Sequence, residues 1–339
     1  MHNSLLQLFP ANRRNFWGKT ASEYRRLQEI RIRVDKPVVL LCEGSELFLN
    51  EEGEFQETSK YAYCVDRMEL EEILNHLCHY SMYAYEDELR QGFLTVSGGH
   101  RIGIAGQVVR EGENVIRTIK NISYINIRIA HQIRGVADKV LPRLYHEGKL
   151  KNVLIISPPG CGKTTLLRDI IRQVSDGNAY GVGRCVGVVD ERSEIAGSYQ
   201  GQPQNDIGMR TDVLDGCPKT LGMMLLLRSM SPQVIAIDEL GGEEDMKALH
   251  IAAFCGVGIL ATVHGESIED VTERFGWKEN HGQELFDVFL ILGKENGRPV
   301  VKKMVKKEEL YATVVRRKHD CDRMSGVGNV VSATIYPEA

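Results

Sequence analysis

The sequence lacks the features that would place the chain in a membrane, outside the cell or around a structural metal. No apolar run approaches the ~20 residues that span a membrane, and the first residues contain no apolar signal-peptide core. The 8 cysteines include no Cys-x-x-Cys pair, which argues against a zinc ribbon and a thioredoxin-like motif. Unpaired cysteines in a chain of this length indicate a reducing compartment. We therefore expect a cytoplasmic protein that reaches a membrane only through partner proteins.

The chain also lacks an excess of positive charge. Its formal net charge is -4, and no stripe of basic and aromatic residues stands out. Proteins that bind nucleic acid through the phosphate backbone need such positive charge, so we expect no nucleic-acid partner. The hydrophobic content of 42% and charged content of 26% are typical of a globular protein, and 339 residues suggest two domains or one large one.

The stretch VLIISPPGCGKTT, residues 153–165, is the strongest motif in the chain. Val153–Ile156 predicts a buried parallel strand, and a loop with two glycines follows it. Lys163 and Thr164 then open a segment with helical apolar spacing, at Leu166, Leu167, Ile170, Ile171 and Val174. A strand, a glycine loop, Gly-Lys-Thr and a helix in this order form the phosphate-binding P-loop.

This motif predicts ATP and Mg²⁺ as cofactors. The two loop glycines allow backbone N–H groups to surround phosphate, and the helix N-terminus adds partial positive charge. Lys163 would reach the β- and γ-phosphates, and the Thr164 hydroxyl would hold Mg²⁺. The motif normally begins with glycine, but this chain has Ser157 there. The predicted nucleotide-binding residues are Ser157, Pro158, Pro159, Gly160, Cys161, Gly162, Lys163, Thr164 and Thr165.

A second apolar strand, Val234–Ile237, ends in Asp238 and Glu239, which is the Walker B pattern. Asp238 would hold Mg²⁺ together with Thr164, and Glu239 would polarise the attacking water. Because the carboxyl ends of parallel strands meet at one crevice, we expect these acids to lie near the P-loop. The alternative is a strand end capped by solvated acids.

Two more strands end in polar residues. Val186–Val189 leads into Asp190, Glu191 and Glu194, which would orient water or Mg²⁺ unless they form a charged surface loop. The strand 259–263 ends in His264. That histidine would hydrogen-bond a phosphate or a catalytic acid, unless it is satisfied locally.

Two arginines in the N-terminal part of the chain are candidate arginine fingers. Arg101 follows a glycine turn, and Arg128 lies on the polar face of the predicted strand 122–130. Phosphoryl transfer needs a cation in addition to Lys163, so either arginine would complete the site within its own chain or in a neighbouring subunit. A solvated or structural ion pair is the alternative.

The chain is predicted to combine an α/β RecA-like P-loop domain, with a parallel-rich sheet, and a smaller α+β domain in front of it. Strands alternate with helices from about residue 151 to 315, which is typical of a parallel sheet. Hairpins and a capped helix fill residues 1–130. Residues 131–150 are predicted to form a linker helix that ends at Gly148, and residues 316–339 a polar tail.

The order of these motifs resembles the type II and type IV secretion and pilus ATPases. Asp190–Glu194 is similar to their Asp box, Glu239 to their Walker B glutamate, and Ala261–His264 to their His box. That superfamily implies a hexamer with nucleotide near the boundary between two domains. Type II relatives often carry a tetracysteine metal insert, which this sequence lacks.

The chain resembles the stage III sporulation protein AA family of endospore-forming bacteria more closely. The segments that carry this resemblance are SPPGCGKTTLLRDIIRQVSDG, VVDERSEIAG, SGGHRIGIAGQVV and INIRIA, and it extends over about residues 25–305. It implies an ATPase of the mother cell that powers a channel complex to the forespore. The implied partners are membrane-embedded sporulation channel proteins, contacted through protein surfaces.

Three other functions compete with this interpretation. An ABC ATPase is suggested by Val96–His100, but the signature loop of that family follows the P-loop, whereas this segment precedes it. A nucleic-acid motor would show hydrolysis that is stimulated by DNA and sensitive to salt. A nucleotide-binding scaffold without hydrolysis stays open, because acids in place do not prove turnover.

Overall fold

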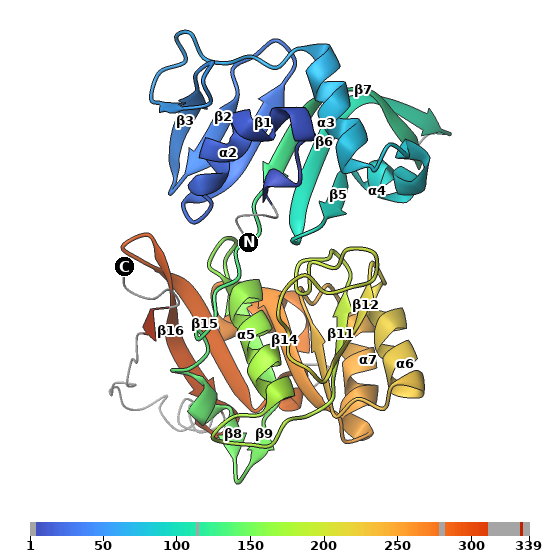
Figure 1. The fold of residues 1–339 in the computed structure, drawn as a ribbon. Helices are drawn as coiled ribbons and strands as arrows, with labels where there is room; N and C mark the ends of the chain where they lie inside the picture. The colour runs from blue at the N-terminus through green and yellow to red at the C-terminus, as the bar shows by residue number, and fades with distance from the viewer. Residues whose placement is uncertain (1–4, 113–114, 278–281, 311–332, 335–339) are drawn as a thin grey trace. The chain divides into compact units, whose positions relative to one another are not determined.

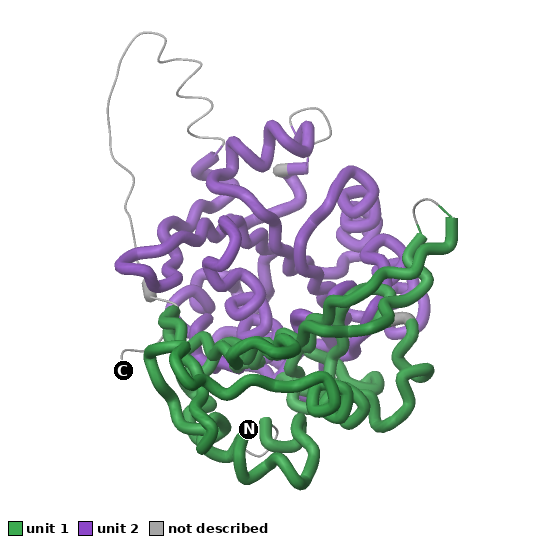
Figure 2. Tube along the Cα trace, turned by 90° about the horizontal axis from the view of Figure 1, so that it is seen from above, with its two compact units in different colours: residues 1–131, 197–205 green, residues 132–196, 206–339 purple. Residues whose placement is uncertain are grey.

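The computed structural model describes residues 5–112, 115–277, 282–310 and 333–334 (Figure 1). The chain divides into two compact units, which Figure 2 colours separately. Unit 1 comprises residues 1–131 and 197–205, and unit 2 comprises residues 132–196 and 206–339. A short segment from the second half of the chain is therefore part of unit 1.

The described part of unit 1 is built on a seven-stranded antiparallel sheet in the order β4-β3-β2-β1-β7-β6-β5. The strands are β1 (Leu27–Arg33), β2 (Val39–Cys42), β3 (Ser45–Leu49), β4 (Phe55–Gln56), β5 (Phe93–Val96), β6 (His100–Glu111) and β7 (Val115–Arg128). The helical elements are η1 (Ala11–Arg13), α2 (Arg14–Ser22), α3 (Arg67–Leu77), η2 (Met82–Tyr85) and α4 (Glu86–Gln91).

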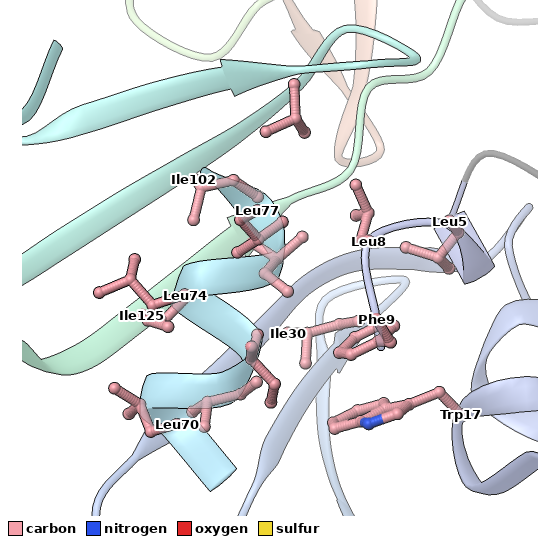
Figure 3. Packing of buried hydrophobic residues seen from close by; sticks show 14 of the residues in the cluster. Leu5, Leu8, Phe9, Trp17, Ile30, Leu70, Leu74, Leu77, Ile102 and Ile125 are labelled. Atoms are coloured by element: carbon pink, nitrogen blue, oxygen red, sulfur yellow. The ribbon is translucent and has the colours of Figure 1, made fainter. Parts of the chain in front are cut away.

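Helix α3 shows why these residues fold as they do. The Asp66 side chain accepts a hydrogen bond from the Glu69 backbone N–H at 2.8 Å, which caps the helix N-terminus. The apolar side chains at helical spacing then face the core of unit 1, where Leu70, Leu74 and Leu77 lie toward the strand residues Ile102 and Ile125 (Figure 3). The predicted capped helix is present, but the Glu69 side chain contacts Tyr63 and Arg13, so the reciprocal capping-box bond to the Asp66 N–H is not seen among the described residues.

The first twenty residues contribute to the same core. Trp17 of α2 is fully buried, and its ring stacks on Phe9 with 4.1 Å between ring centroids (Figure 3). Leu5 and Leu8 are buried beside them. Large aromatic side chains contribute much of the apolar area of a core, so this segment stabilises unit 1.

The described part of unit 2 contains an eight-stranded sheet in the order β12-β11-β13-β14-β10-β15-β16-β17. Its strands from β12 to β15 are parallel, and β16 and β17 run antiparallel at one edge. The strands are β10 (Val153–Ser157), β11 (Val186–Asp190), β12 (Thr211–Asp215), β13 (Val234–Ile237), β14 (Gly258–His264), β15 (Val288–Glu295), β16 (Arg298–Lys306) and β17 (Ala333–Thr334). The helices are α5 (Lys163–Asp176), α6 (Lys219–Ser229), α7 (Glu243–Phe254), α8 (Ile268–Arg274) and η4 (Gly282–Leu285).

Both faces of this sheet are covered, so its central strands are buried throughout. On β10, Val153 and Ile155 belong to the core that contains α5, whereas Leu154 and Ile156 belong to the core that contains α6 and α7. This alternation follows from the two-residue period of a strand, and it explains the continuous apolar run in the sequence. Among the described residues, no helix is long and apolar enough to cross a membrane.

The predicted linker helix over residues 131–150 is wrong. That segment contains only the 3-10 turn η3 (Leu141–Arg143) and the short hairpin of β8 (Tyr145–His146) and β9 (Lys149–Leu150). Pro142 has no N–H to continue a helix, and the Ala137 N–H is bound instead by Asp169 of α5 at 2.9 Å.

The remaining predictions concern the domain boundaries and the C-terminal tail, of which the structure describes only two residues. The division of the chain at residues 130, 150 and 315 stays a prediction. The predicted tail, 316–339, lies outside the described residues, except for Ala333 and Thr334, which pair with β16.

Candidate functional site

The P-loop connects β10 to α5 in unit 2. Ser157, the last residue of β10, is buried, and its hydroxyl donates to the Pro158 carbonyl at 2.8 Å. Gly160 and Gly162 have φ of 67° and 80°, in the left-handed region that favours glycine. Gly162 is the N-cap of α5, and no side chain of the described chain caps that helix. The first N–H groups of α5 therefore point into the loop, where an anion would bind.

Lys163 and Thr164, the first two residues of α5, contact the Walker B acids. The Lys163 side chain is only 9% exposed, and its Nζ lies 2.7 Å from Glu239 Oε1 and 3.4 Å from Asp238 Oδ1. Thr164 Oγ1 donates to Asp238 Oδ2 at 2.6 Å. Thr164 and Asp238, which are predicted to hold Mg²⁺, are thus in direct contact. Their hydroxyl and carboxylate oxygens are ligands that Mg²⁺ prefers.

Glu239 has an unusual backbone and a crowded carboxylate. Its φ is 58°, a conformation that costs energy for a residue with a side chain and often marks a functional position. Oε1 accepts from Lys163 and from His264 Nε2 at 2.9 Å, and Oε2 accepts from Arg192 Nη1 at 2.9 Å. Burial raises the pKa of Glu239, but the bonds from Lys163 and His264 outweigh that effect and lower it to about 2.

Thr262 supports both Walker B acids from the neighbouring strand β14. Its buried hydroxyl donates to Asp238 and accepts from the Glu239 backbone N–H at 2.9 Å. We did not predict this role from the sequence. A hydroxyl residue in an otherwise aliphatic buried strand, two positions before His264, is the signal that points to it.

Asp190, at the end of β11, anchors the loop that follows it. Asp190 is 2% exposed, and its carboxylate accepts backbone N–H bonds from Glu194, Ile195 and Ala196 at 2.8, 3.0 and 2.8 Å. Burial raises the pKa of Asp190 to about 6, although these three bonds act in the opposite direction. The half-buried Arg168 of α5 donates to the carbonyls of Glu194 and Ile195, each at 2.6 Å.

The acids predicted at the ends of two strands, β11 and β13, meet in one place. A small cavity is lined by Asp190, Glu191, Arg192, Glu194, Lys219, Asp238 and Glu239. Glu191 forms an ion pair with Lys219 there. The ends of β11 and β13 therefore converge in this cavity, and His264 at the end of β14 contacts Glu239. The catalytic roles of these residues stay predictions.

The two candidate arginine fingers lie in unit 1. Arg101 of β6 and Arg128 of β7 are paired in register on neighbouring antiparallel strands. The Arg101 guanidinium lies over the Phe93 ring, 3.7 Å from its centroid, and Arg128 Nε lies 3.7 Å from Glu29 Oε1. Each has a neighbour within its own unit, and the role of either as a finger stays a prediction.

The structure adds two cations to the P-loop site that we did not predict from the sequence. Arg192 contacts Glu239, as described above. Lys294 of β15 lies near the P-loop, since its Nζ would be 3.7 Å from a Cβ placed on Gly160. Arg192 lies within the predicted segment Asp190–Glu194, but the sequence does not show its contact with Glu239, 47 positions away, and no motif marks Lys294.

Comparisons with known proteins agree with this architecture. The family described as "Sporulation stage III, protein AA" matches residues 1–310. The chain is 40% identical to stage III sporulation protein AA of Bacillus subtilis (strain 168) over 307 residues, which cover 90% of this chain and 95% of that protein.

Solved structures show the same fold at low sequence identity. The Legionella pneumophila ATPase DotB aligns with a TM-score of 0.57 at 17% identity, over 88% of this chain and 82% of that one. The pilus retraction motor PilT with bound ADP aligns with a TM-score of 0.55 at 14% identity, over 87% and 85%. The fold is the RecA-like α/β fold of secretion and pilus ATPases with a separate antiparallel N-terminal unit, as the sequence predicted.

With a family match over residues 1–310 and a relative 40% identical over nearly its whole length, the chain belongs to the sporulation stage III protein AA family.

Proposed function

We propose that the protein is an Mg²⁺-dependent ATPase whose hydrolysis drives a sporulation channel complex. The observation that carries the proposal is the convergence of five side chains at the carboxyl ends of the parallel strands of one sheet: Lys163, Thr164, Asp238, Glu239 and His264. These side chains come from three elements, and each has the chemistry that phosphoryl transfer needs at its position.

Each of these residues has a separate role in the proposed reaction. The N-terminus of α5 and Lys163 bind phosphate oxygens, while Thr164 and Asp238 hold Mg²⁺. Bound Mg²⁺ supplies positive charge that offsets the charge developing on the transferred phosphate. Glu239 orients the attacking water and accepts its proton, and His264 positions that carboxylate.

The contacts of Glu239 suggest how nucleotide would activate it. A carboxylate with a pKa of about 2 is a poor proton acceptor. Lys163 is its nearest cation, at 2.7 Å. A phosphate that attracts Lys163 would remove this contact and make Glu239 more basic when the substrate is present.

The larger role rests on the family. The Bacillus subtilis relative carries the name stage III sporulation protein AA. From that kinship we propose a mother-cell protein that works as a homo-hexamer and contacts membrane-embedded channel proteins through protein surfaces. The mass of the purified protein with and without ATP tests the oligomer.

Two substitutions test the chemistry. Lys163→Ala should abolish nucleotide binding or turnover, because it removes the cation that contacts the phosphates. Glu239→Gln should still bind ATP, while hydrolysis falls on the order of 10²-fold, typical of lost acid–base assistance. Lys247→Ala is the matched control, since it removes a lysine from an exposed ion pair with Glu243 on α7.

Phosphate release and ATP binding are measured on the same samples. Unchanged hydrolysis in Lys163→Ala would overturn the site assignment. Binding without turnover in the unmodified protein would instead indicate a nucleotide-binding scaffold.

A further inference from the structure

Arg192 lies at the tip of a loop whose other residues are held in place. Asp190 binds three N–H groups beyond it, and the neighbouring Ser193, with φ of 53°, donates its hydroxyl to Asp215 Oδ1 at 2.7 Å. Glu191 on the other side pairs with Lys219. The loop is thus fixed on both sides of Arg192, and the Arg192 side chain is 62% exposed.

The contacts of Glu239 are divided between its two oxygens. Lys163 and His264 bind Oε1, whereas Arg192 binds Oε2 at 2.9 Å. A nucleotide phosphate in the P-loop would compete for Lys163, the first residue of α5. If Lys163 turned to phosphate, the Glu239 carboxylate would keep its contacts with Arg192 and His264.

We propose that Arg192 is a positioning residue that holds Glu239 Oε2 while Lys163 leaves for the nucleotide. The inference rests on the proposed function and adds how Glu239 keeps its position when Lys163 moves from its carboxylate to the nucleotide phosphate. Arg192 acts through Glu239 and does not touch the phosphate. Its contribution to nucleotide binding should therefore depend on the Glu239 carboxylate.

A double-mutant cycle tests this dependence. The variants are Arg192→Ala, Glu239→Gln and the two combined, and the measurement is the Kd for a fluorescent ADP in the presence of Mg²⁺. Arg192→Ala should weaken binding about threefold to fivefold, the upper range for an exposed ion pair. In the Glu239→Gln background the same change should alter the Kd by less than about 1.5-fold, because the charge that Arg192 holds is already absent.

Two further variants control for structure. Arg192→Lys keeps a cation and should recover at least half of the lost binding free energy, whereas a purely structural role for the fork-shaped guanidinium would not be recovered. Arg67→Ala removes an exposed arginine paired with a glutamate in unit 1 and should leave the Kd unchanged. Arg192→Gln replaces Arg192→Ala if the alanine variant does not fold.

Each outcome decides the proposal. An equal loss of affinity in both backgrounds would overturn it and assign Arg192 to the phosphate. No loss in either background would overturn it and leave Arg192 as a solvated surface residue. If the unmodified protein does not bind Mg²⁺-ADP, the proposed function fails and this inference fails with it. If it binds normally and Arg192→Ala has no effect, only this inference fails.

Discussion

The buried carboxylate of Asp190 should make the protein less stable as the pH rises. Two effects oppose each other at this residue, since burial favours the neutral acid and three N–H donors favour the anion. In the folded protein burial prevails, and the pKa rises from 3.8 to about 6. The folded state therefore holds a proton between pH 4 and 6 that the unfolded chain has already released.

The size of the effect follows from this difference in pKa. Each unit of difference between the folded and unfolded pKa corresponds to about 1.36 kcal/mol. The free energy of unfolding should therefore fall by about 3 kcal/mol as the pH rises from below 4 to above 6. About 2 kcal/mol of that change falls between pH 4.5 and 7. Asp190→Asn resembles the neutral acid and cannot titrate, so its stability should lack this contribution.

The assay is urea unfolding of both proteins at several pH values between 4.5 and 7. The sequence has 2 tryptophans, one in each unit, so a shared Trp17→Phe substitution leaves Trp277 to report on unit 2. Other carboxylates titrate equally in both proteins, and their effects cancel in the difference.

The difference between the two proteins decides between the two opposing effects. The stability of Asp190→Asn relative to Asp190 should increase by about 2 kcal/mol across this range. Parallel curves, within about 0.5 kcal/mol, would show that the N–H donors outweigh burial and would refute the reasoning.

Three further changes probe other parts of the site. His264→Ala should still bind ATP but lose the coupling of hydrolysis to transport, with little change in melting temperature because that side chain is 40% exposed. A large fall in melting temperature with normal activity would indicate a structural histidine. Thr262→Val keeps its shape but loses one donor and one acceptor, so urea unfolding should show a loss of about 2–3 kcal/mol that Thr262→Ser largely restores; equal stability in the valine variant would contradict the support that we assign to this hydroxyl. Mixing inactive Arg101→Ala and Glu239→Gln proteins should restore hydrolysis if the arginine serves a neighbouring subunit, and full activity in both Arg101→Ala and Arg128→Ala would exclude these two as fingers.

The sequence was informative where function depends on consecutive residues. The P-loop, the Walker B strand and the strand ending in His264 were all predicted, because each is a short apolar strand with polar residues at its carboxyl end. The meeting of these strand ends also followed, since parallel strands place their carboxyl ends at one edge.

The contacts that hold the site in place were not predictable. Arg168, Arg192 and Thr262 act on residues 23 to 47 positions away, so the sequence does not show which partners they contact. The predicted linker helix failed for a related reason. Tertiary contacts, including the bond from Ala137 to Asp169, replaced the helical pattern that its composition suggested.

The segment 197–205 has a consequence for attempts to divide the protein into fragments. It belongs to unit 1, where Gln204 accepts from the Gly98 N–H at 2.9 Å and the Tyr199 hydroxyl bonds His79. A fragment ending at residue 131 would contain every strand of the first sheet and still lack these partners. The complementary fragment would carry the segment with nothing of unit 1 to pack against. A functional dissection of this chain is therefore better made by substitutions, or by supplying both pieces together, than by truncation.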